Sequence, residues 1–361
     1  MNTLNFDAIA VCSKDLDFIN FLEFCESKNI AFSNTLIITI GSGTRQQSVT
    51  TLVNAYKVNS IKLPDFDVYS MLSQRYLLFG NTSLLKKSII TLISYFSQHI
   101  YRFFILLIWK YRLRSFITGY LYLDMWRTKV PALAYISYKK AVIGDGGVSS
   151  EVLDLVGLWK ENKGQFKVVA AYLDKQINFA IERKNTSGLL TYIHKLHVKI
   201  LYGYSFRVLR NIEKNWPNES LFFSSYVKSD QISLSNNYSF FKRECNSFSK
   251  GQYVLVIGHP AFRTLNASVD KLKENSLPVR YNFHPRDKQL FKKNKKLKSK
   301  NHAVIKKLGW EVEDTDLSLE SILISKQSIP SRIITYETSA LVFITNILPK
   351  DVSIEYVKVE T

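Results

Sequence analysis

The last third of the chain alternates short apolar stretches with helical patterns, and each apolar stretch runs into residues suited to binding phosphate. The stretches and the residues that follow them are 253–257 with Gly258, 281–283 with His284, and 333–336 with Thr338 and Ser339. Alternating strands and helices predict a parallel sheet. The carboxyl ends of parallel strands meet at one edge of the sheet, so we expect these residues to line a nucleotide phosphate site.

A second alternation of strand and helix opens the chain. Residues 7–11 and 35–40 have the composition of buried strands, and residues 15–28 between them have a helical pattern. This opening predicts a further doubly wound sheet. The glycine-containing turn after its second strand either joins strand and helix or binds an acceptor through three residues, Gly43, Thr44 and Arg45.

Composition divides the chain into two domains. Its 361 residues are enough for two domains of ordinary size. A serine-rich, polar stretch between Trp216 and Gly251 is typical of a linker. We therefore predict an N-terminal domain over residues 1–240, with a helical, membrane-proximal insert at about 83–122, and a C-terminal domain over residues 250–361.

The net charge of +19 predicts an anionic partner, which could be nucleic acid, a membrane surface or a phosphorylated substrate. The chain shows no nucleic-acid recognition motif, and its aromatic residues cluster in apolar stretches, so we expect no nucleic acid. The apolar run 103–109 is shorter than the roughly 20 residues that cross a bilayer. Basic residues bracket it, so it is either a core helix with basic ends or a helix at the lipid headgroups. The basic run 292–300 is either a solvated loop or a site that attracts an anionic donor or lipid.

Residues that bind metals or form disulfides are dispersed along the chain. Cys12, Cys25 and Cys245 are too far apart to predict a disulfide framework or a zinc site, and a reducing cytoplasm is the expected compartment. The N-terminus lacks the pattern of a signal peptide. Three Asp-x-Asp triplets and the pair His194 and His197 lack the sequence context of a metal site. We therefore expect neither a metal nor a cofactor.

Four short motifs follow one another along the chain: Gly144-Asp145-Gly146, His284-Pro285, Glu320, and Thr338-Ser339. This set resembles the bacterial sialyltransferases of lipooligosaccharide and capsule synthesis, which include glycosyltransferase family 52 and the polysialyltransferases. Those families carry an acidic pair with glycine, a His-Pro step and a pair of hydroxyl residues in the same order. The resemblance covers the C-terminal third and the Asp145 loop. It departs at Gly144, where the families have a first acid, and at Thr338, where they have serine.

The resemblance implies an α/β protein with the GT-B fold, in which two Rossmann-like domains face each other across a cleft. It implies a CMP-sugar donor held by the C-terminal domain, a glycan acceptor held by the N-terminal domain, and inverting, metal-independent transfer. Its implied catalytic residues are Asp145 as general base and His284 at the donor phosphate. Its implied donor-binding residues are Gly258, Arg286, Glu320, Thr338 and Ser339. The structural alternative for Asp145 is a turn residue that caps the helix beginning near Ser149.

The expected function is transfer of sialic acid, or a related nonulosonic acid, from a CMP-sugar to a surface glycan or glycolipid. The expected location is the cytoplasm, peripherally associated with an anionic surface at the inner face of the cell membrane. A transferase that uses CMP-Kdo and a non-catalytic, basic protein that binds membranes or glycans are the alternatives. The acceptor, the linkage and the number of sugars added are open.

Overall fold

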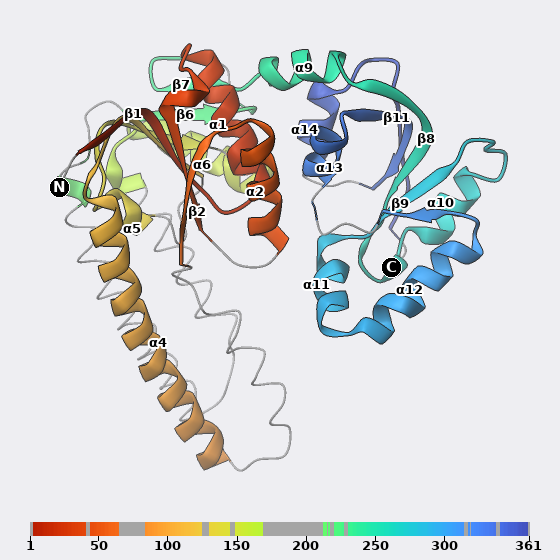
Figure 1. The fold of residues 1–361 in the computed structure, drawn as a ribbon, viewed down its shortest axis with the longest axis horizontal. Coiled ribbons are helices and arrows are strands. Elements are labelled where there is room, and N and C mark those ends of the chain that lie inside the picture. Colours follow the sequence, from red (N-terminus) through yellow and green to blue (C-terminus); the bar gives the residue numbers. More distant parts are fainter. Residues whose placement is uncertain are drawn as a thin grey trace. The chain divides into compact units, whose positions relative to one another are not determined.

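A computed structural model describes residues 3–40, 44–64, 84–124, 130–144, 149–168, 212–214, 216, 220–226, 230–313, 317, 319–336 and 340–359. Strands and helices alternate through these residues and form two parallel sheets in two compact units (Figure 1). Unit 1 comprises Met1–Ser13, Lys28–Ser42 and Val58–Ser235, and unit 2 comprises Lys14–Ser27, Gly43–Lys57 and Asn236–Thr361.

The sheet of unit 1 has seven strands in the order β3-β2-β1-β4-β5-β6-β7, and all neighbouring pairs are parallel. The strands are β1 (Leu4–Cys12), β2 (Thr35–Ile40), β3 (Asn59–Leu63), β4 (Phe116–Asp124), β5 (Ser137–Gly144), β6 (Ser220–Ser224) and β7 (Ser233–Ser235). The strand order reverses between β1 and β4, which makes the sheet doubly wound. All six residues of β2 are buried, as is typical of a parallel strand inside an α/β unit.

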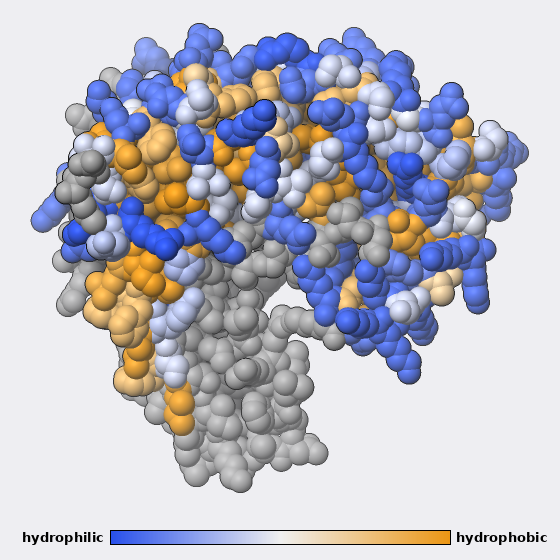
Figure 2. All heavy atoms as spheres, viewed as in Figure 1, coloured by the Kyte–Doolittle hydropathy of each residue, from blue (hydrophilic) through white to orange (hydrophobic). Residues whose placement is uncertain are grey.

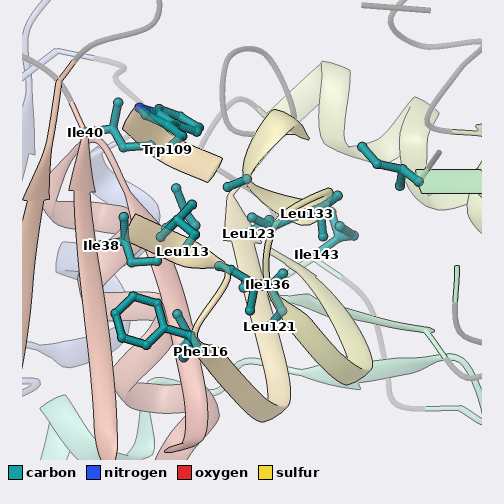
Figure 3. Close-up of a cluster of buried hydrophobic side chains, with 14 of the residues drawn as sticks. Ile38, Ile40, Trp109, Leu113, Phe116, Leu121, Leu123, Leu133, Ile136 and Ile143 are labelled. Atoms are coloured by element: carbon teal, nitrogen blue, oxygen red, sulfur yellow. The ribbon is translucent and has the colours of Figure 1, made fainter. Parts of the chain in front are cut away.

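Helix α4 (Leu84–Leu113) packs its C-terminal half into the core of unit 1. Figure 3 shows Trp109 and Leu113 of this helix near Ile38 and Ile40 of β2, with side chains from β4 and β5 beside them. Trp109 is fully buried, and its indole N–H donates a 3.1 Å hydrogen bond to the carbonyl oxygen of Pro64. The other helices that the structure describes in unit 1 are η1 (Phe32–Asn34), α5 (Val130–Leu133) and α6 (Ser149–Glu161).

The helical insert is shorter than the sequence pattern predicted. Helix α4 ends at Leu113 and strand β4 begins at Phe116, so residues 116–122 form a central strand of the sheet. The aromatic and leucine residues there suit a helical period as well as a strand. Pairing with β1 on one side and with β5 on the other decides between the two conformations.

The serine-rich stretch contains regular secondary structure, and the division between the two units falls within it, between Ser235 and Asn236. It contributes β6 and β7 to the sheet of unit 1 and helix α9 (Ser239–Asn246) to unit 2. Ser220 is buried and donates a 2.6 Å hydrogen bond to the carbonyl oxygen of Gly164, and Ser233 donates one of 2.7 Å to the carboxylate of Asp230. Nearby acceptors satisfy these hydroxyls, so a polar composition did not mean an exposed chain.

The sheet of unit 2 has five parallel strands in the order β10-β9-β8-β11-β12. These are β8 (Ser249–Ile257), β9 (Val279–Asn282), β10 (Glu311–Val312), β11 (Ser328–Thr335) and β12 (Ser353–Tyr356). The order reverses between β8 and β11, so this sheet is also doubly wound. Besides α9, the described residues of unit 2 form the helices α1 (Asp15–Ser27), α2 (Thr44–Ala55), η3 (Pro260–Phe262), α10 (Leu265–Lys271), α11 (Pro285–Lys293), α12 (Lys295–Lys307), α13 (Leu319–Lys326) and α14 (Ala340–Ile347).

Helix α1 is almost wholly buried and bonds to the C-terminal part of the chain through its polar residues. The carboxylate of Glu23 accepts hydrogen bonds from the backbone N–H groups of Phe240 and Phe241, at 3.1 and 2.8 Å. These groups belong to the first turn of α9, which has no capping side chain at its own N-cap, so Glu23 serves as the cap. The amide of Asn236 also donates a 3.0 Å hydrogen bond to Asn20. These bonds explain why α1 belongs to unit 2 although it follows β1.

The two sheets confirm the expected fold class. Each unit is α/β with a parallel, doubly wound sheet, and two Rossmann-like units of this kind are the building blocks of the GT-B fold.

Candidate functional site

Ligands of doubly wound sheets bind at the carboxyl ends of the strands, where the strand order reverses. In unit 2 this edge is formed by the ends of β8, β9 and β11, and we call it the carboxyl edge. Gly258 and His259 follow β8, His284 lies two residues after β9, and Tyr336 follows β11. The ring of His259 lies 4.8 Å from that of Tyr336 and 6.4 Å from that of His284, between centroids. Folding therefore brings together two imidazoles and a phenol from three strand ends.

His284 lies at the start of helix α11. Its carbonyl oxygen accepts a 3.1 Å hydrogen bond from the backbone N–H of Lys288, and Pro285 is the first residue of the helix. Proline suits this position because its ring presets the helical φ and the first N–H of a helix has no partner within it. The positive end of the helix dipole and the free N–H groups of a first turn favour anions. The His-Pro step thus places an imidazole at a helix end whose dipole and free N–H groups favour an anion.

The turn after His259 has a strained backbone. Ala261 and Phe262 both have positive φ, of 57° and 59°, in the left-handed region that non-glycine residues rarely occupy. Each such residue costs on the order of 1–3 kcal/mol, and such residues cluster at functional sites. The hydroxyl of the buried Thr264 accepts a 3.3 Å hydrogen bond from the backbone N–H of His259, and the carboxylate of Asp287 accepts one from Ala261. Burial raises the pKa of Asp287, while the hydrogen bond and the charge of His259 act against that rise.

Gly258 is required by packing at the carboxyl edge. A Cβ atom at this position would overlap the hydroxyl of Tyr281 on the neighbouring strand β9. Tyr281 is buried, its hydroxyl has no hydrogen-bond partner among the described residues, and burial raises its pKa. The glycine turn therefore has a structural cause beside its predicted donor contact.

The same arrangement recurs in unit 1 and explains why residue 144 is a glycine. Gly144 is the last residue of β5, and a Cβ atom there would overlap the hydroxyl of Tyr122 on β4. Tyr122 is fully buried, so its ring has little room to move. An acidic side chain cannot fit at residue 144 in this packing, which leaves Asp145 as the acid of the motif.

A pair of carboxyl groups lies between helices α1 and α13 of unit 2. The hydroxyl of Ser321 donates a 2.8 Å hydrogen bond to the buried Asp15. Burial, and then the charge of Glu320, raises the pKa of Asp15 from 3.8 to about 7, while the bond from Ser321 lowers it. Glu320, the predicted ribose contact, lies in the first turn of α13 and is partly buried. The structure thus couples a predicted site residue to a buried acid that titrates near neutral pH.

Sequence reasoning missed Asp15, His259 and Tyr336 as members of these clusters. From the sequence, Asp15 is at the start of a predicted helix, where an acidic side chain offsets the helix dipole. Helix α1 has apolar residues on all sides, with phenylalanine, isoleucine and leucine at six of its 13 positions, which predicts that its polar residues are buried as well. That pattern is a signal that could have identified Asp15.

Several predicted site residues are outside the described part of the chain. Asp145, Gly43, Thr338 and Ser339 are not described, although Asp145 follows β5 directly in the sequence. For three others, the backbone alone is described: Thr44 and Arg45 begin α2, and Arg286 lies in the first turn of α11. Of the predicted site residues, the structure therefore brings together Gly258 and His284, and it places Glu320 beside Asp15.

The described residues contain no group of three or more His, Cys, Asp or Glu side chains that could hold a metal ion. Cys12, Cys25 and Cys245 are buried and form no disulfide.

Comparisons with known proteins give one structural likeness. No family model matches the chain, and no curated protein matches it. Among solved structures, the chain is similar to the GT-B domain of a sialyltransferase from Photobacterium damselae, with 10% sequence identity and a TM-score of 0.40. The match covers 98% of this chain and 90% of that one.

Proposed function

We propose that the chain is a glycosyltransferase that uses a nucleotide-activated sugar, with the nucleotide held at the carboxyl edge of unit 2. The observation that carries the proposal is the meeting of His259, His284 and Tyr336 at the strand-order reversal, beside the N-terminus of α11. Aromatic rings can pack against a nucleoside, and an imidazole with a helix N-terminus can bind its phosphate. The strained turn at residues 261 and 262 adds a feature typical of functional sites.

The donor we propose is a CMP-sugar that carries sialic acid or a related nonulosonic acid. The support is the motif series around Asp145, His284, Glu320 and Thr338-Ser339 described in the sequence. In this proposal His284 and Arg286 neutralise the phosphate of the departing CMP, and Thr338 and Ser339 donate further hydrogen bonds to it. Glu320 accepts hydrogen bonds from the ribose.

The acceptor we propose is a glycan or glycolipid at the inner face of the cell membrane. Its hydroxyl is too weak an acid to attack unaided, so a base must remove the proton as the new bond forms. Asp145 has that role in the proposal, and Gly43, Thr44 and Arg45 contact the acceptor. Protein groups meet the charge of the phosphate, so the proposed transfer needs no metal. It is inverting because the acceptor oxygen displaces CMP from the anomeric carbon in a single step.

A donor panel tests the proposal. The purified chain is incubated with CMP-sialic acid, CMP-Kdo and a UDP-sugar, each with a lipooligosaccharide or capsular acceptor, and released nucleotide is measured. Release of CMP from CMP-sialic acid is the expected result. Release of CMP from CMP-Kdo alone would assign Kdo as the transferred sugar and leave the proposed reaction otherwise the same. Acceptor binding without nucleotide release from any donor would indicate a non-catalytic glycan-binding protein.

A further inference from the structure

Helix α4 has a core face that fixes it to unit 1. Ile105, Trp109 and Leu113 are buried in the hydrophobic core of that unit. The indole of Trp109 donates to Pro64, and the guanidinium of Arg112 donates a 3.0 Å hydrogen bond to the carbonyl oxygen of Lys62. The C-terminal half of the helix is therefore held in one orientation, with a defined side turned away from the core.

The opposite side of α4 is apolar and exposed. We call it the apolar stripe, and it consists of Ile93, Phe96, Ile100, Phe103, Phe104, Leu107, Ile108 and Tyr111. The relative exposure is 67% at Phe96, 57% at Phe104 and 62% at Tyr111. These residues recur every three or four positions, so they form one face, about 27 Å long at 1.5 Å per residue. Figure 2 shows the described part of this helix as a band of hydrophobic side chains.

An exposed apolar face of this length calls for an occupant, because proteins rarely leave such a surface in water. Charge identifies the kind of occupant. The 30 residues of α4 include three lysines and two arginines and no acidic residue. Arg114, which follows the helix, lies 5.2 Å above the ring of Tyr111, so a further positive charge stands at the end of the stripe.

A second copy of the chain fits this charge poorly. If two copies paired through the stripe, all charged side chains of the two α4 helices would be basic, whether the helices ran parallel or antiparallel. Like charges repel, so this pairing is unfavourable. An anionic bilayer surface matches both features of the helix. Its negative headgroups attract the basic residues, and the apolar layer directly beneath them accommodates the apolar side chains.

We propose that the apolar stripe of α4 docks on an anionic membrane surface, with the helix lying in the plane of the interface. The phenylalanine and leucine side chains enter the acyl boundary, and Tyr111 lies at the level of the headgroups. Lys110 and Arg114 are exposed and contact the negative headgroups. Among the described residues, no helix is long and apolar enough to cross a membrane. This docking does not depend on the proposed transfer reaction.

Vesicle flotation with the full chain tests the proposal. The vesicles contain equal parts of phosphatidylglycerol and phosphatidylcholine, or phosphatidylcholine alone, and no sugar donor is present. The chain should float with the anionic vesicles at low salt and separate from them at high salt, because salt screens the headgroup attraction. The triple variant Phe96→Gln, Phe104→Gln and Leu107→Gln should lose at least about 90% of this binding.

Two control variants separate the stripe and its basic residues from surface hydrophobicity and surface charge in general. Leu4, Leu158 and Tyr356 are also exposed apolar residues, and their combined replacement with glutamine should leave binding unchanged. Replacement of Lys110 and Arg114 with glutamine should weaken vesicle binding roughly thirtyfold. Each basic residue near an anionic surface contributes about 1 kcal/mol, and about 1.4 kcal/mol corresponds to a tenfold change in affinity. Replacement of the exposed Lys139 and Lys242 should weaken it less.

Each contrary result has a definite meaning. Absence of binding, or salt-resistant binding to neutral vesicles, would overturn the proposal. So would a triple variant that binds like the parent. If that variant instead converts a dimer to a monomer, the occupant is a second copy. If it lowers the melting temperature strongly, the stripe is part of the folded core, and the charge variant then decides whether vesicle binding uses this helix at all.

Discussion

Replacing Asp15 with asparagine should stabilise the protein, and the gain should grow with pH. The folded-state pKa of Asp15 is raised from 3.8 to about 7, because its burial and the charge of Glu320 disfavour the carboxylate. A group whose pKa is raised by folding binds its proton more tightly in the folded state. Stability is therefore lost as pH rises from the unfolded pKa to the folded one, and the loss is complete above the folded pKa.

The size of the effect follows from the two pKa values. Each pH unit between them costs about 1.36 kcal/mol, so a rise from 3.8 to about 7 costs about 4 kcal/mol at pH 8 and about 1.5 kcal/mol at pH 5. Asparagine keeps an oxygen that can accept the 2.8 Å hydrogen bond from Ser321 and has no proton to lose. The variant should therefore escape the penalty without losing this contact.

The assay compares the unfolding of parent and variant by calorimetry at pH 5 and pH 8. The variant should gain about 2–3 kcal/mol more at pH 8 than at pH 5, which is a difference of several degrees in melting temperature. Glu320→Gln is a second test, since loss of that charge should lower the pKa of Asp15 and shift the pH dependence downward. Asp7→Asn is a control at an exposed acid. An equal gain at both pH values, or a loss at pH 8, would refute the reasoning about Asp15.

Three further predictions concern the proposed reaction. His284→Ala should lower turnover at least about a hundredfold, which is the usual effect of losing a donor that stabilises developing charge. His259→Ala should lower turnover less, because the Nδ1 of His259 lies 3.1 Å from the carbonyl oxygen of Pro260 and so contacts the backbone of its own turn. Steady-state kinetics of both variants decide the ranking, and the reverse order would make His259 the phosphate contact. Asp145→Asn should lose roughly 10²–10⁴ in kcat with donor affinity nearly unchanged, and normal turnover would remove Asp145 from the mechanism. Turnover should survive EDTA, so loss on chelation with recovery in Mn²⁺ would contradict a metal-independent transfer.

The α/β class and the candidate edge could be predicted from the sequence because both depend on local signals. Buried parallel strands give continuous apolar runs, and the residues that end them, such as Gly258 and His284, share one edge whatever the rest of the chain does. This prediction needs only the position at which each strand ends, so it does not depend on contacts between distant residues.

The parts that could not be predicted depend on contacts between distant residues. Asp15 meets Ser321, which is 306 positions away, and Asn20 meets Asn236, which is 216 positions away. No local pattern assigns α1 to unit 2. Similarly, residues 116–122 satisfy two periodicities, and their pairing with β1 and β5 selects the strand.

The central claim is that the carboxyl edge of unit 2 binds the phosphate of a nucleotide, and a crystal structure of the full chain with CMP tests it most directly. The phosphate is predicted to lie at the ends of β8, β9 and β11, within hydrogen-bond distance of His284 and against the first turn of α11. A nucleotide bound at another place, with this edge empty, would contradict the account.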